Sequence, residues 1–164
     1  MPPAARITDN VAHPLPPVLT GGPTAITVII GFLPAWRGIN PAAAAALQVA
    51  KQISDTAIQV AEAATLAAAG TPGAPAAKTA EELVKSTAAA TMGSMISSMS
   101  GGTDIHTCFT PLPIPPHGPG VVITPSATVM IANQPAARMG DTILEAVGPP
   151  NTIVKGEPTV IIGG

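Results

Sequence analysis

The short motif Pro-Ala-x-Arg recurs in this chain of 164 residues, and its spacing constrains the fold more than any other feature. Copies lie at residues 3–6, 34–37 and 135–138. Segments rich in β-branched residues precede the second and third copies by the same step, and a further such segment lies at residues 159–162. Short β-branched segments bounded by glycine and proline are typical of strands. Self-similarity at a fixed step predicts one repeated unit, made of a strand, a turn through the motif and another short strand.

Composition narrows the possible classes of protein. The chain has 20 Pro and 16 Gly, so it turns often, and it has one Trp, two Phe and no Tyr, which excludes a large aromatic core. Small cores need support from a metal or a partner. A net charge of −2 gives no reason to expect nucleic-acid binding, and one Cys excludes an internal disulfide framework. We see no secretory signal at the N-terminus.

Residues 41–100 have a different character from the rest of the chain. The second and third motif copies are 101 residues apart, against 31 for the first two, and the excess is rich in alanine. Asn40 followed by Pro41 is typical of a helix start, and Gly70 of a helix end. Thr79 with Glu82 has the spacing of a capping box. We therefore predict a hairpin of two helices of roughly 20–29 residues joined by a loop at residues 70–77.

Apolar residues at helical spacing predict which faces of these helices pack. Lys51, Asp55 and Glu62 fall on the opposite, polar face of the first helix. The predicted apolar faces are Val49, Ile53, Ala57, Val60 and Ala64 in the first helix, and Val84, Ala88, Thr91, Met95 and Met99 in the second.

Every histidine and the only cysteine of the chain can join one metal site. The residues are His13, His106, Cys108 and His117, of which the last three fall within twelve residues. One thiolate and three imidazoles make a complete tetrahedral zinc set, and a site with four protein ligands is structural. The residue types alone leave an ordinary alternative open, since a single Cys is commonly a small buried apolar residue and histidines commonly lie at the surface.

The motif copies, the histidine and cysteine set and two longer segments, residues 133–141 and 156–163, resemble the PAAR-repeat proteins. These are the spike-tip proteins of type VI secretion and related contractile injection systems. The resemblance covers residues 1–40 and 101–164. It implies a mainly β fold, a small cone-shaped β-repeat domain with pseudo-threefold character, interrupted by the inserted helical hairpin at residues 41–100. It also implies one structural Zn²⁺ per chain near the tip, held by His13, His106, Cys108 and His117.

The same resemblance implies a role and partners. The base of the cone would sit on a VgrG-like trimeric spike, and the tip would puncture a target membrane through transient contact and help to load effectors. The protein would be assembled in the bacterial cytoplasm and then secreted with the spike. The repeated arginines, Arg6, Arg37 and Arg138, have two possible roles: hydrogen bonding to turn carbonyls and to carboxylates such as Asp9 or Asp141, or contact with the spike.

Two other classes of function compete with this one. A hydrolase could be imagined from His106 and Cys108 with Glu145 or Glu157, but the chain has no recognised catalytic motif, so we expect no enzyme. The hairpin could dock on the spike flank, an effector or a chaperone, or it could act on membranes. The charges of Lys51, Asp55 and Glu62 argue against a membrane span. An adaptor or effector that acts through this hairpin is the alternative function.

Overall fold

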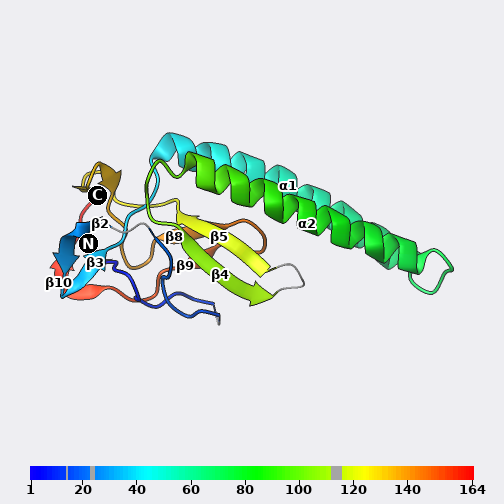
Figure 1. The fold of residues 1–164 in the computed structure, drawn as a ribbon, viewed down its shortest axis with the longest axis horizontal. Coiled ribbons are helices and arrows are strands. Elements are labelled where there is room, and N and C mark those ends of the chain that lie inside the picture. Colours follow the sequence, from blue (N-terminus) through cyan, green and yellow to red (C-terminus); the bar gives the residue numbers. More distant parts are fainter. Residues whose placement is uncertain (14, 23–24, 112–115) are drawn as a thin grey trace.

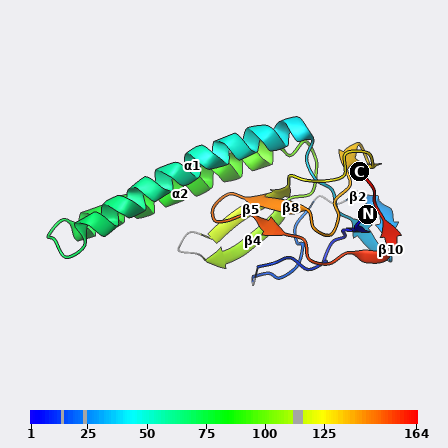
Figure 2. The same cartoon turned by 180° about the vertical axis from the view of Figure 1, so that it is seen from behind.

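The computed structural model describes residues 1–13, 15–22, 25–111 and 116–164. A small β part carries a long two-helix arm, and the arm projects past the β part at the end opposite the two termini (Figures 1 and 2). The fold is mainly β with two helices, as predicted. The elements in chain order are β1 (Pro3–Ala4), β2 (Ala25–Ile30), β3 (Leu33–Ala35), α1 (Pro41–Ala68), α2 (Ala74–Met99), β4 (His106–Pro111), β5 (Pro116–Val122), β6 (Met130–Ile131), β7 (Gln134–Pro135), β8 (Thr142–Glu145), β9 (Asn151–Thr152) and β10 (Glu157–Ile161).

The strands form one antiparallel sheet and three two-stranded ribbons. The sheet has the order β4-β5-β8-β9, and the ribbons are β1-β10, β2-β3 and β6-β7. The ribbons lie at the end of the molecule that holds both termini (Figure 1). The first residues of each motif copy lie in one strand of a ribbon, in β1, β3 or β7, so a repeated two-stranded unit is confirmed. The motif forms part of a strand, however, and the turns between β2 and β3 and between β6 and β7 precede it.

The three motif copies are joined in a ring of backbone hydrogen bonds. The third residues of the copies are Ala5, Trp36 and Ala137. Ala5 N donates to Ala137 O, Ala137 N donates to Trp36 O, and Trp36 N donates to Ala5 O, each at 2.9 Å. A cyclic pattern of this kind gives the β part its pseudo-threefold character. Trp36 is fully buried in the core beside Ala5 and Ala137, so one large ring fills space that two alanines leave.

Each motif arginine is bound by an aspartate in the same way. The backbone N of Arg6, Arg37 and Arg138 donates to Oδ2 of Asp9, Asp104 and Asp141 at 2.8, 2.9 and 2.7 Å, and each guanidinium contacts the same carboxylate. The role of the arginines in internal hydrogen bonding is therefore confirmed. In the first and third copies the aspartate follows three residues after the arginine, but Asp104 follows Arg37 by 67 residues.

The helices thus stand between an arginine and the aspartate that completes its repeat. The two ends of this insertion lie side by side, because Thr103 Oγ1 donates to Gly38 O at 2.9 Å and Ile39 N donates to Val122 O at 3.0 Å. Gly38 has no room for a side chain, since a Cβ there would lie 2.8 Å from both Pro125 Cβ and Val122 O. The ring is therefore complete despite the interruption.

The start of α1 is confirmed, and the start predicted for α2 is wrong. Asn40 Oδ1 accepts from Ala43 N at 2.9 Å, as an N-cap does. The second helix begins at Ala74, with a proline in its first turn, a position where a missing N–H costs nothing. Thr79 lies inside this helix, and its hydroxyl donates to Pro75 O at 3.0 Å instead of forming a capping box.

The predicted packing face of the first helix is wrong, whereas Met95 and Met99 of the face predicted for the second helix do pack against the core. Residues of the predicted first face, among them Val49, Ile53 and Val60, are exposed. The buried residues are Ala44, Leu47, Lys51 and Ile58 in α1, and Glu81, Lys85, Met92 and Ile96 in α2. Alanine-rich helices carry apolar atoms on several faces, and contact with the β part decides which of them is covered. Leu47, Met92 and Ile96 share a core with Val121 and Leu144 of the sheet.

Charged side chains join the helices where apolar packing was predicted. Lys85 of α2 contacts Glu62 of α1 and Glu81 of its own helix, each at 2.6 Å. The hydrogen bond from Lys85 lowers the pKa of Glu81 to about 2. The lysine is buried, so the two carboxylates provide the partners that a buried charge requires.

Candidate metal centre

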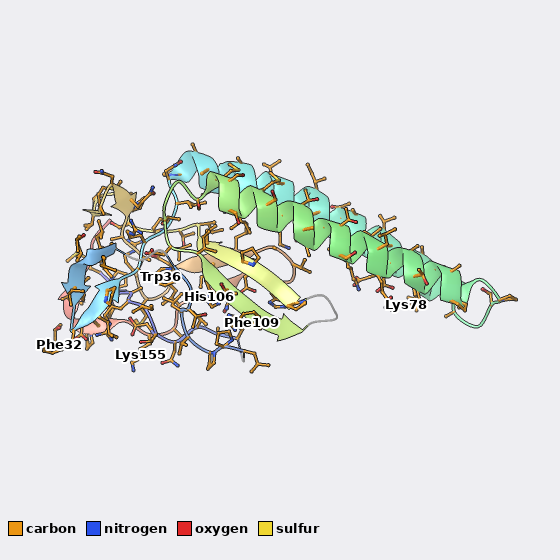
Figure 3. All side chains as sticks on the ribbon, viewed as in Figure 1. Phe32, Trp36, Lys78, His106, Phe109 and Lys155 are labelled. Atoms are coloured by element: carbon orange, nitrogen blue, oxygen red, sulfur yellow. The ribbon has the colours of Figure 1, made fainter. Side chains whose placement is uncertain are left out.

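Strand β4 supplies two side chains of the candidate site. His106 and Cys108 are two residues apart, so they point to the same face of the sheet. Both are almost completely buried, at 1% exposure. Figure 3 shows His106 on this strand, between the buried Trp36 and the exposed Phe109.

The N-terminal loop brings His13 to the same place. Backbone hydrogen bonds fix the loop along β4: Phe109 N donates to Leu15 O at 3.1 Å, and Thr107 N donates to Thr20 O at 3.0 Å. The loop is also tied to β9, since Ala12 N donates to Thr152 O at 3.0 Å. As a result His13 Nε2 lies 2.7 Å from His106 Nε2, although the two residues are 93 positions apart in the sequence.

Glu145, at the end of β8, is a member of the site that sequence reasoning did not assign to a metal. His106 is paired with Gly120 of β5, and Gly120 is paired in turn with Glu145, so the three lie in one row across the sheet. A Cβ on Gly120 would lie 3.0 Å from Glu145 Cγ. The missing side chain therefore leaves the space through which the carboxylate reaches the histidines.

One ligand atom from each of His13, His106, Cys108 and Glu145 lies within 4.8 Å of the others. Glu145 Oε1 is 3.4 Å from His13 Nε2 and 3.9 Å from His106 Nε2. Burial lowers the pKa of His106 to about 4 and also lowers the pKa of His13, so both imidazoles favour the neutral form that binds metals. A thiol, two neutral imidazoles and a carboxylate suit Zn²⁺. These residues therefore fit the predicted zinc.

His117 is not part of this group of four. Its Nδ1 lies 2.6 Å from Glu145 Oε2. The contacts of His13 and His106 are instead with the other oxygen of this carboxylate, Oε1. The Nε2 of His117 is buried, with no hydrogen-bond partner among the described residues. The structure thus brings together three of the four predicted ligands and adds Glu145, while the assignment of His117 as a ligand stays a prediction.

Of the residues considered for catalysis, His106, Cys108 and Glu145 lie together in the candidate metal centre, and Glu157 lies elsewhere. Glu157 bonds Arg6 at 2.5 Å, as part of the ribbon end of the molecule. His106 and Cys108 are buried too deeply for a substrate to reach them.

Comparison with known families decides the identity of the fold. A model of the PAAR motif matches residues 112–164, which hold the third motif copy, Glu145 and β10. Residues 112–164 thus carry a PAAR motif, and this match supports a PAAR-repeat protein. The PAAR family is structural rather than enzymatic, and its motif indicates a role associated with spike tips. The comparisons gave no significant match to a curated protein or to a solved structure. His13, His106 and Cys108 precede the matched segment, and the fold brings them to it.

Proposed function

We propose that this PAAR-repeat protein caps a VgrG-like trimeric spike of a contractile secretion or injection system. The observation that carries the proposal is the hydrogen-bonded ring of three motif copies, because it lets one chain present three similar ribbons to a threefold-symmetric partner. Assembly takes place in the bacterial cytoplasm, and the protein leaves with the spike, punctures the target membrane and helps to deliver effectors.

The ribbon end of the molecule supplies the docking base. It carries exposed apolar side chains that a lone β structure has no reason to display, and exposed apolar patches commonly mark protein contacts. Phe32, in the turn between β2 and β3, is 98% exposed and lies at the extreme of this end in Figure 3. The others on the ribbons are Ile26, Ile29, Met130 and Ile161.

In this proposal the metal supports the part of the β structure that lies away from the ribbons and would form the tip. Zinc at the candidate centre would join the N-terminal loop, β4 and β8, three segments remote in the sequence. It would be a structural ion, and in this proposal its role is to hold a thin β structure rigid during injection.

Substitution of an exposed apolar residue in the proposed base should weaken docking without unfolding the β part. Phe32→Asp places a charge in the proposed apolar interface, and we expect its affinity for the spike trimer to fall at least about tenfold. Pull-down and titration with the purified spike would measure this. The matched control is Leu66→Asp, which places the same charge on an exposed apolar residue of α1. Equal binding by Phe32→Asp and the wild-type protein would contradict the docking proposal.

The helical hairpin is the basis of a second, additional role in binding an effector or a chaperone. A groove of about 600 Å³ lies between the helices, lined by uncharged residues that include Ile53, Ala57, Val84, Ala88 and Met95. Among the described residues, neither helix is long and apolar enough to cross a membrane. The groove therefore supports contact with a protein over insertion into lipid.

Deletion of the hairpin separates the two roles. Because Gly38 and Thr103 are in contact, a short Gly-Ser link can replace residues 41–100. We expect spike assembly to be retained and loading of cargo to be lost, each measured separately by co-purification. Unchanged cargo loading would contradict a role of the hairpin in binding an effector or a chaperone. Leakage of liposomes caused by the full chain but not by the deletion variant would favour the membrane role instead.

A further inference from the structure

We propose that Glu145 is the fourth zinc ligand of this chain and that His117 orients Glu145 from outside the ligand set. The inference rests on the zinc centre of the proposed function and deepens it. It departs from the assignment that the family resemblance implies, in which His117 completes the set.

The distances place the carboxylate where a ligand belongs. Tetrahedral Zn²⁺ with bonds of about 2.0–2.3 Å keeps its donor atoms about 3.3–3.7 Å apart. Glu145 Oε1 lies 3.4 Å from His13 Nε2 and 3.9 Å from His106 Nε2, close to this spacing. The Glu145 side chain is fully buried, so contacts with the protein fix the position of this oxygen.

The imidazole of His117 is turned away from the site. Its Nδ1 contacts Glu145 Oε2 at 2.6 Å, and its Nε2 faces the backbone at Gly148, where an added Cβ would lie 2.6 Å from that nitrogen. Carboxylates that bind metals are commonly held by a hydrogen bond to their second oxygen. His117 supplies this bond, and Asn151 Nδ2 adds a longer one to Oε1 at 3.4 Å.

Charge balance explains why a carboxylate can be buried at this site. A buried carboxylate beside neutral imidazoles is costly unless a positive charge compensates it. Zn²⁺ bound by one thiolate, one carboxylate and two neutral imidazoles has no net charge. The buried site of Cys108, Glu145, His13 and His106 therefore holds its ion without leaving an uncompensated charge in the core.

The absence of a side chain at Gly120 leaves room for Glu145 to reach the proposed metal position. Gly120 stands between His106 and Glu145 in the row across the sheet, and a Cβ there would meet Glu145 Cγ and Ile143 Cγ2, each at 3.0 Å. Glycine at this position allows the longer side chain to lie over β5.

Zinc affinity of matched variants tests the inference. Competition with a chromophoric chelator would compare the full-length wild-type protein with Glu145→Gln and His117→Gln. Loss of a ligand should lower zinc affinity by more than about 100-fold in Glu145→Gln, whereas loss of an outer partner costs about 10–100-fold in His117→Gln. Glu157→Gln, which removes a carboxylate from the Arg6 contact, should leave the affinity unchanged. The reverse order of the two effects would overturn the inference.

X-ray absorption by the wild-type zinc protein gives an answer even if Glu145→Gln fails to fold. We expect one sulfur, one oxygen and two imidazoles around the ion. Three imidazoles with one sulfur would overturn the role of Glu145 and leave the proposed zinc centre intact. A wild-type protein that binds no zinc would instead overturn the centre itself, so the two failures are distinguishable.

Discussion

Removal of zinc, or replacement of Cys108 by Ser, is expected to lower the melting temperature by at least about 10 °C. Zinc binding to small domains contributes on the order of 10–16 kcal/mol. One kcal/mol corresponds to about 2–4 °C in a chain of this size, so even a fraction of that free energy gives a large shift. The effect is large because the ion would join the His13 loop, β4 and β8 at one buried point.

Calorimetry with and without a chelator would measure the shift. The chelator should destabilise the wild-type protein and have no further effect on Cys108→Ser, since that variant has already lost the thiolate. Thr107→Ser, on the other face of the same strand, is the control for a small change in β4. A metal-free protein that melts at the same temperature as the zinc protein would contradict a structural role for the ion.

Replacement of Asp104 by Ala is expected to cost about 3–5 kcal/mol of unfolding free energy, because it leaves the Arg37 guanidinium buried beside an empty position. Both side chains are buried, and their Nη2 to Oδ1 distance is 2.8 Å. Burial raises the pKa of Asp104 even though Arg37 lowers it, so desolvation outweighs the attraction at this carboxylate. We therefore expect the intact ion pair to fix where the chain returns after the helices, and to add little to the free energy of unfolding.

Urea denaturation of the zinc-saturated protein would measure this cost. Asp141→Ala should lose less, because the side chain of Arg138 is more exposed than that of Arg37. The double variant Arg37→Met with Asp104→Leu should regain part of the stability, since it leaves no unpaired charge. Equal losses in Asp104→Ala and the double variant would show that the unpaired charge is not the cause.

The sequence predicted those features that short-range patterns determine. The motif copies and the β-branched segments predicted the repeated ribbons, and Asn40 with Pro41 predicted the start of α1. The packing face of α1 was missed because alanine makes several faces equally apolar, so the packing partner decides between them. Lys51 and Lys85 are buried with acidic partners, which a simple division into polar and apolar faces cannot show.

Three residues of the candidate site were predicted, and Glu145 was not predicted to lie with them. His13, His106 and Cys108 come together as their chemistry suggested. Glu145 was overlooked as a ligand because nothing local marks it, apart from its being the only charge in the apolar segment of residues 143–147. The position of Glu145 depends on the register between β5 and β8. The need for glycine at residue 120 therefore becomes visible only once these two strands are paired.

The contact between Gly38 and Thr103 has a consequence for how such proteins diversify. The two ends of the insertion meet at this contact, so the structure of the β part does not depend on the length of the segment between them. Segments of other lengths and chemistries could therefore be exchanged there while the three ribbons and the ring that joins them stay unchanged.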